Sequence, residues 1–388
     1  MFGKKSALKF VVLLGLVSLF ADVTYEGARS ITGPYLATLG ASGTAVGFVA
    51  GFGELVGYGL RLVSGILSDR TRRYWFFTIL GYAVNVLAVP FLALAGRWEI
   101  AASLIICERF GKAIRTPARD AMLSHAAEAV GRGWAFGLHE AMDQIGAMLG
   151  PLLVALVIYF RGDYKAGFAA LLVPALLAVA VLLAARFLYP HPEHLEINTV
   201  HFGEKGFGRE FWVYCAASAA VAAGFADFPL VAFHFGKVSS VPAIWIPCFY
   251  AIAMGVDGLA ALLFGRFFDR HGILVLVFVN GACAFFAPLV FFGDFWGALG
   301  GMMLWGIGMG AHESVMRAVV SGLVSSQRRA TAFGIFNMAY GVFWFLGSFI
   351  MGILYDISIP SLIIFSFIAQ WASLPLLFWL SRKEARTA

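Results

Sequence analysis

The chain alternates between long apolar stretches and short polar or charged turns from one end to the other. Each apolar stretch is about 20 residues or longer, enough for an α-helix that rises 1.5 Å per residue to cross roughly 30 Å of hydrocarbon. We place twelve spans at residues 8–39, 45–67, 75–96, 99–124, 134–160, 165–189, 210–236, 242–268, 273–293, 295–323, 330–356 and 358–381. The pattern predicts an all-α membrane protein with twelve transmembrane helices.

The spans form two groups of six, separated by the longest polar stretch of the chain at residues 190–208. Three short sequences recur on both sides of this stretch at nearly the same offset. Gly65 to Arg70 recurs as Gly265 to Arg270, Phe20-Ala21-Asp22 as Phe225-Ala226-Asp227, and Ala135-Phe136-Gly137 as Ala332-Phe333-Gly334. Internal repeats of this kind are typical of transporter folds. We therefore predict two pseudo-symmetric six-helix bundles, at 1–189 and 209–388, joined by a cytoplasmic linker at 190–208.

The composition indicates that the lipid bilayer is the solvent of this chain. Hydrophobic residues make up 61% and charged residues only 13%, whereas soluble proteins average about 25% charged residues. The formal net charge of +6 comes from short loops between spans, so nucleic acid is not an expected partner. The first apolar segment contains Asp22, Glu26 and Arg29, and we interpret it as a retained helix rather than a signal peptide.

The basic residues are distributed unevenly between the two sides of the predicted bundle. One side has only Arg97, Arg161, Lys165 and Lys237, and about four times as many lie on the other. The positive-inside rule then puts both termini in the cytoplasm, which requires an even number of spans. We expect a monomeric, multi-pass protein of the plasma (inner) membrane. The four cysteines lie in different spans without metal-ligand spacing, so we expect neither a metal nor a cofactor.

Two loops at corresponding places carry an aspartate between a glycine and arginines. The first contains Gly65, Asp69, Arg70 and Arg73, and the second contains Gly265, Asp269 and Arg270. A carboxylate at a helix end beside guanidinium groups can form charge-assisted hydrogen bonds between moving helices, which hold one conformation until they break. The alternative is an ordinary basic loop, which the repetition in both halves disfavours.

The fifth span carries small residues at regular intervals, followed by a proline. They are Gly137, Gly146, Gly150 and Pro151. Small residues at these spacings let neighbouring helix backbones approach closely, and the proline weakens the helix where the halves would move. The alternative is generic packing between helices.

In these motifs the sequence resembles the major facilitator superfamily, over essentially the whole chain. The first loop is similar to the family pattern Gly-x-x-x-Asp-Arg-x-Gly-Arg-Arg, with departures at Arg72 and Tyr74. The fifth span is similar to the family's antiporter motif, and Arg109 matches its intramembrane arginine. The resemblance implies the major facilitator fold, alternating access, and a central aqueous cavity lined by helices 1, 4, 7 and 10. Because the antiporter motif accompanies export in this family, it favours an outward direction of transport.

The fourth span is unusually rich in charge, and it departs from the family pattern at Lys112, Ala113 and Arg115. At 100° per residue, Glu108, Lys112, Arg115 and Arg119 project within about 60° of one another and form one polar stripe. Each charge near the membrane middle costs at least about 2.5–3.5 kcal/mol, so it needs an aqueous cavity or a partner. The candidate cavity or substrate-binding residues are Arg29, Glu54, Arg109, Lys112, Arg115, Asp227, Glu313 and Arg317. The alternative is a set of buried structural ion pairs.

Three acidic residues are candidates for proton coupling. Asp22 and Glu26 lie one turn apart on the first span, and Asp143 lies on the fifth. Two neighbouring carboxylates in a low dielectric cannot both ionise cheaply, although Arg29 on the same face would offset this effect. We expect one of these acids to carry the proton, with Lys112 and Arg115 holding the substrate or a counter-carboxylate.

The sequence therefore predicts a proton-coupled secondary active transporter that works by alternating access and exports a small organic solute. Lys112, Arg115 and Arg29 favour one alternative, an uptake symporter for an anionic metabolite. A second alternative is a non-transporting membrane sensor or lipid-handling protein, because fold does not fix function. No Gly-x-Ser-x-Gly, His-Glu-x-x-His or phosphate-loop pattern occurs, which argues against an enzyme and against a primary pump.

Overall fold

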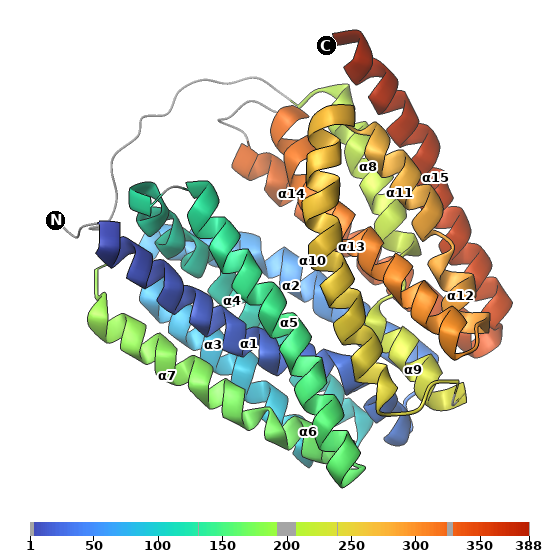
Figure 1. Cartoon of the computed structure of the whole chain (residues 1–388), viewed down its shortest axis with the longest axis horizontal. Coiled ribbons are helices and arrows are strands. Elements are labelled where there is room, and N and C mark those ends of the chain that lie inside the picture. The colour runs from blue at the N-terminus through green and yellow to red at the C-terminus, as the bar shows by residue number, and fades with distance from the viewer. Residues whose placement is uncertain (1–3, 131, 192–206, 239, 324–328, 388) are drawn as a thin grey trace. The chain divides into compact units, whose positions relative to one another are not determined.

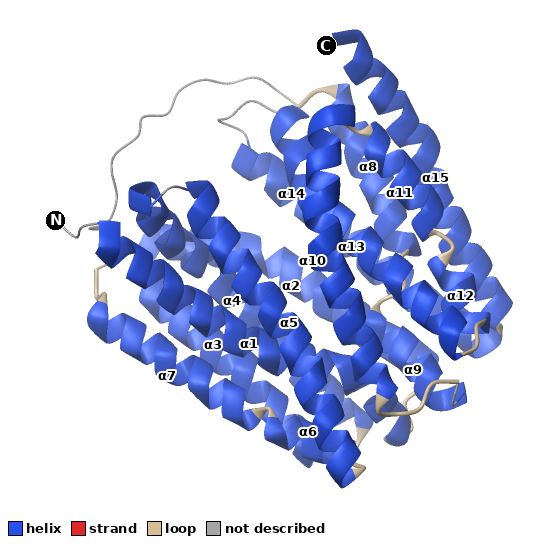
Figure 2. Cartoon of the chain, in the orientation of Figure 1, coloured by secondary structure: helices blue, strands red, loops and turns tan. Residues whose placement is uncertain are grey.

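The computed structural model of the chain is helical throughout the residues that it describes, which are 4–130, 132–191, 207–238, 240–323 and 329–387 (Figure 1). Figure 2 shows that only loops join these helices. The elements in chain order are α1 (Lys4–Thr38), α2 (Gly43–Thr71), α3 (Tyr74–Phe91), the 3-10 turn η1 (Leu92–Leu94), α4 (Trp98–Val130), α5 (Arg132–Arg161), α6 (Tyr164–Ala170), α7 (Leu172–Leu188), α8 (Arg209–Gly224), α9 (Phe228–Val238), α10 (Trp245–His271), α11 (Leu274–Cys283), α12 (Phe286–Phe292), α13 (Phe295–Leu323), α14 (Arg329–Ile357) and α15 (Ile359–Thr387).

Ten helical segments of the described residues are long and apolar enough to cross a membrane. Two further long helices, α4 and α13, correspond to the fourth and tenth predicted spans and are not among these ten. The predicted all-helical membrane fold is confirmed in this coarser form. The count of twelve spans stays a prediction.

Three predicted spans are each built from two helices in the structure, namely the pairs α6 and α7, α8 and α9, and α11 and α12. In each pair the break lies about four residues before a proline, at Pro174, Pro229 and Pro288 respectively. Proline has no N–H to donate, and its ring clashes with the carbonyl group four residues earlier, so the regular helix ends there. Pro34 and Pro151, by contrast, lie inside continuous helices.

The chain divides into two compact units, which we describe separately. Unit 1 contains Met1–Ile31 and Val56–Val200, and unit 2 contains Thr32–Leu55 and His201–Ala388. The end of α1 and the first half of α2 thus pack with the second half of the chain. The division into bundles at 1–189 and 209–388 stays a prediction. Most of the predicted linker, residues 192–206, lies outside the described residues.

In unit 1, α3 and α4 cross in backbone contact. A Cβ atom on Gly81 would lie 2.6 Å from the backbone nitrogen of Arg115, and one on Gly111 would lie 2.8 Å from the Cα atom of Asn85. Only glycine permits this approach, because no side chain fits the remaining space. The crossing brings Tyr82 and Asn85 to the charged stripe of α4.

In unit 2, aromatic side chains surround the break between α8 and α9. The indole Nε1 of Trp305 donates a hydrogen bond to the carbonyl oxygen of Ala226 at 2.9 Å. The ring centre of Phe225 lies 5.6 Å from that of Trp305 and 5.9 Å from that of Trp344. A buried carbonyl left without a partner costs about 1–3 kcal/mol. Trp305 therefore stabilises the interrupted helix.

Unit 2 also contains a helix cap supplied by a residue distant in sequence. The Asp356 carboxylate, near the end of α14, accepts hydrogen bonds from the backbone N–H of Gly43 at 2.9 Å and from that of Thr44 at 2.7 Å. The Thr44 hydroxyl donates a third bond to it at 2.7 Å. Because Gly43 begins α2, the carboxylate also lies at the positive end of the helix dipole. The first half of α2 is thereby fastened to α14.

We expect Asp356→Ala to lower the thermal stability of the protein, because it removes three hydrogen bonds at one helix N-terminus and a single side-chain cap contributes about 0.5–2 kcal/mol. Thermal unfolding of the detergent-purified full chain measures the effect. The control is Asp163→Ala, which removes one local cap bond from the N–H of Lys165 and should lower Tm less. If the Tm of Asp356→Ala is equal to or higher than that of Asp163→Ala, the distant cap does not stabilise the protein as we expect.

Candidate functional site

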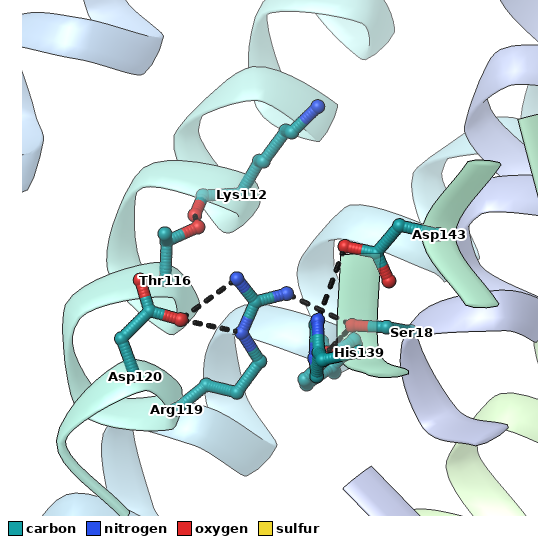
Figure 3. Close-up of polar contacts among 8 residues, drawn as sticks. Ser18, Lys112, Thr116, Arg119, Asp120, His139 and Asp143 are labelled. Carbon is teal, nitrogen blue, oxygen red and sulfur yellow. Dashed lines mark hydrogen bonds and ion pairs between the residues drawn. The ribbon is translucent and has the colours of Figure 1, made fainter. Parts of the chain in front are cut away.

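The charged stripe of α4 lies in unit 1, and Figure 3 shows the contacts of Arg119 with Asp120 and Ser18. Its guanidinium group contacts Asp120 Oδ1 through Nε at 2.9 Å and through Nη2 at 2.8 Å. Nη1 donates to the Ser18 hydroxyl of α1 at 2.8 Å, and that hydroxyl lies 3.1 Å from the hydroxyl of Tyr82 on α3. Arg119 thus connects three helices through a continuous polar network.

Glu108 and Arg109 form a second hydrogen-bonded group nearer the start of α4. The Arg109 Nε lies 3.3 Å from Glu108 Oε2, and the Asn85 side-chain amide donates to Glu108 Oε1 at 2.6 Å. Glu108 and Arg109 are both buried. Their arrangement corresponds to the structural ion pair that the sequence left open as an alternative.

Lys112 and Arg115 lie between these two groups along the helix, and both meet tyrosine rings. The Lys112 ammonium nitrogen lies 4.0 Å from the ring centre of Tyr25 on α1. The guanidinium carbon of Arg115 lies 4.2 Å from the ring centre of Tyr82 and 5.7 Å from that of Tyr25. Cation–π contacts are worth about 2 kcal/mol or more when they are desolvated. The two rings therefore help to keep two cations inside the unit.

Asp22 faces this pair of cations from α1. It is buried, and the charges that act most strongly on it are those of Asp143, Lys112 and Arg115. Charges of both signs thus act on Asp22, and its pairing with the cations of helix 4 stays a prediction.

Two other acids surround the same cations. Asp143 of α5 is half-buried, and its Oδ2 lies 3.4 Å from Nδ1 of His139 one turn earlier. Among the charges that act on Lys112, that of Glu26 has the largest effect. The sequence paired Asp22 with Glu26, but the carboxylate whose charge acts most strongly on Asp22 is that of Asp143. This proximity depends on how α1 and α5 pack.

The glycines of α5 produce that packing. A Cβ atom on Gly146 would lie 2.8 Å from Cβ of Asp22, and one on Gly150 would lie 2.8 Å from the backbone nitrogen of Gly27. The two helix backbones are in contact over this stretch, and Pro151 follows without interrupting α5. The predicted close approach at this motif thus occurs against α1, at the level of Asp22.

Among the other predicted cavity residues, Glu54, Asp227 and Glu313 belong to unit 2. Asp227 is buried at the break before α9, where the Trp344 indole donates to its Oδ2 at 3.4 Å. Arg29 and Glu54 are half-buried on α1 and α2, Glu313 is exposed on α13, and the side chain of Arg317 lies outside the described residues.

The predicted gating loops are described only in part. Arg70 in the last turn of α2 and Arg73 just after this helix are exposed, and Arg270 is exposed near the end of α10. Gly65 and Gly265 are half-buried within these two helices. The side chains of Asp69 and Asp269, and the surroundings of Gly137, lie outside the described residues. The role of these loops stays a prediction.

Sequence reasoning missed the uncharged members of the site. Ser18, Tyr25, Tyr82 and Asn85 satisfy or cover the charged groups of α4. Tyr25 stands between Asp22 and Glu26 in sequence, and Tyr82 and Asn85 are one turn apart in an otherwise apolar span. Such spacing could have indicated a polar face, but aromatic residues in spans usually contact lipid or pack in the core.

The sequence is similar to a known protein family and to proteins of other organisms. The sequence profile of the Major Facilitator Superfamily matches residues 14–348. An uncharacterized protein of Mycobacterium tuberculosis is 42% identical over 380 residues, which cover 96% of this chain and 93% of that protein. An uncharacterized MFS-type transporter of Methanocaldococcus jannaschii is 28% identical over 372 residues, which cover 90% of this chain and 89% of that one.

Solved structures share the fold at lower sequence identity. The crystal structure of the nucleoside transporter NupG superposes with a TM-score of 0.75 at 17% identity, covering 96% of this chain and 98% of that one. Likeness at this level of identity establishes the fold and carries no information on the solute.

We expect Gly150→Ala to destabilise the protein by about 1–3 kcal/mol, because overpacking a tight helix contact forces the backbones apart. The added methyl group would collide with α1 at Gly27 and at the carbonyl oxygen of Val23. Thermal unfolding in detergent measures the change. The matched control is Gly57→Ala on α2, where a Cβ atom meets open space, so stability should stay equal or rise. Equal Tm values for the two variants would contradict the close packing of α1 and α5.

Proposed function

Because the chain belongs to the major facilitator superfamily, whose members are transporters and not enzymes, we propose that it is a proton-coupled secondary transporter. It works by alternating access and exports a small organic solute across the plasma (inner) membrane. We further propose that both termini are cytoplasmic and that the protein acts as a monomer. The resemblance read from the sequence motifs is confirmed by the family match.

The observation that carries the proton coupling is the pair of acids in unit 1. Asp22 and Asp143 act on each other electrostatically, and the cations Lys112 and Arg115 act on Asp22. A proton taken up by either acid changes the charge balance around these cations in a poorly solvated environment. Such a change biases one conformation over another only if the two conformations differ in their affinity for the proton. Glu26 remains a third candidate carrier.

The direction of transport has two candidates, each favoured by a different feature. Gly146, Gly150 and Pro151 support export, since they match a motif that accompanies export in the family. The cations Lys112 and Arg115 support uptake of an anionic metabolite as the second candidate. Flux measured in right-side-out and everted membrane vesicles under the same pH gradient separates these two candidates.

We predict that Asp22→Asn and Asp143→Asn uncouple transport from the pH gradient, because an amide cannot take up the proton. In everted vesicles with a fluorescent pH probe, solutes from a panel of anions, zwitterions and cations should dissipate the gradient for the parent protein and not for these variants. The control is the exposed loop substitution Asp163→Asn, which should behave as the parent. If solutes dissipate the pH gradient fully in both variants, neither Asp22 nor Asp143 carries the proton.

We propose a gate formed by Gly65, Asp69, Arg70 and Arg73 at the end of α2, with the repeat Gly265, Asp269 and Arg270 at the end of α10. We expect Asp69→Asn to reduce turnover and leave solute affinity unchanged, because a carboxylate at this helix end stabilises one conformation instead of contacting solute. Initial rates of flux at several solute concentrations separate the two quantities. Parental turnover in the variant would rule out this gating role.

A further inference from the structure

Arg115 combines deep burial with hydrogen-bond donors that have no acceptor. Its side chain is 1% exposed, and within the described residues neither Nε nor Nη1 has a hydrogen-bond partner. The Tyr82 and Tyr25 rings attract its positive charge. A ring face is a much weaker acceptor than an oxygen atom, so these N–H groups remain unsatisfied. Buried donors in native proteins are nearly always paired, so the two open donors require an explanation.

Burial on α4 does not by itself leave an arginine with N–H donors that lack an acceptor. Arg119 lies four residues later on the same helix face, and its Nε, Nη1 and Nη2 all contact oxygen atoms of Asp120 and Ser18. Lys112, one turn before Arg115, lies over the Tyr25 ring. The stripe therefore consists of a fully paired arginine beside two cations that are held by aromatic rings.

The acids around these cations do not supply the missing acceptor. Glu26 is the acid that acts most strongly on Lys112, and Asp22 acts on both cations. The donors at Nε and Nη1 of Arg115 nevertheless have no acceptor among the described residues. The hydroxyl of Tyr82 contacts Ser18. The two open donors of Arg115 therefore lack acceptor oxygen atoms, which an anion from outside the chain would supply.

We propose that Lys112 and Arg115, with the rings of Tyr25 and Tyr82, form the subsite that binds a carboxylate or phosphate group of the solute. The solute is then an organic anion. Charge-assisted hydrogen bonds to oxygen anions are the strong contacts that a guanidinium group makes. This inference rests on the proposed transport function and adds the chemical class of the solute.

The test is binding of small aromatic probes to the detergent-purified full chain, measured by titration calorimetry without a pH gradient. The probes are benzoate, phenyl phosphate and the uncharged analogue benzamide. We expect at least one of the two anions to bind, with benzamide about tenfold weaker or more, since a charged hydrogen bond is lost. The stronger anion identifies whether the subsite prefers carboxylate or phosphate.

The variants test whether the binding depends on these two cations. Arg115→Gln and Lys112→Gln should each weaken anion binding by about tenfold or more. Arg115→Lys keeps the positive charge with fewer donors, so it should bind with intermediate affinity, and it replaces Arg115→Gln if that variant fails to fold. The control is Arg186→Gln, which removes a cation that lies over the Trp75 ring elsewhere in unit 1 and should bind as the parent does.

Three outcomes would overturn the anion subsite. In the first, neither anion binds the parent protein, and in the second, benzoate and benzamide bind with equal affinity. In the third, Arg115→Gln binds the anion as tightly as the parent does. If Arg115→Gln does not fold, parental affinity in Arg115→Lys takes its place. Because the measurement uses no gradient, it is independent of which acid carries the proton. Anion binding with intact coupling in the acid variants would reject the proposed proton carriers and keep the subsite.

Discussion

The constraint on which the rest of this structure depends is the cost of keeping charged side chains among membrane-spanning helices. Helix α4 carries Glu108, Arg109, Lys112, Arg115 and Arg119 within little more than three turns, and the two carboxylates Asp22 and Asp143 face it from α1 and α5. Water is largely excluded there, so each charge depends on a partner inside the protein. Serine, tyrosine and asparagine side chains from the neighbouring helices supply most of those partners.

Those partners reach the charges only because glycine allows the helix backbones to touch. Gly81 and Gly111 bring α3 against α4, and Gly146 and Gly150 bring α5 against α1. In lipid there is no hydrophobic force between helices beyond close packing, so small residues at the crossings determine how near the polar groups can come. The small residues and the charged residues therefore act as one system, although they stand on different helices.

The two copies of one repeated sequence have different backbone structures. Phe20-Ala21-Asp22 lies within the continuous helix α1, whereas Phe225-Ala226-Asp227 forms the break between α8 and α9. Pro229 follows the second copy by two residues, where the first copy has Thr24. The proline ends the helix, and the freed carbonyl of Ala226 is paired by the Trp305 indole. The same three-residue sequence thus occurs once in a continuous helix and once at a helix break.

The sequence by itself determined the membrane class, the approximate spans, the internal repeat and the polar stripe of α4, because these depend on hydropathy and helical spacing along one segment. It did not determine which prolines break a helix, since Pro34 lies inside the continuous helix α1 whereas the chain leaves the helical conformation just before Pro229. Nor did it separate the paired Arg119 from Arg115, which projects from a similar face. Arg119 is paired by its neighbour Asp120 and by Ser18 of a distant helix, whereas Nε and Nη1 of Arg115 find no acceptor in either place. Only the tertiary structure decides which donors find an acceptor, because a hydrogen bond needs an acceptor atom within about 3 Å, whether it comes from a neighbour or from a distant part of the chain.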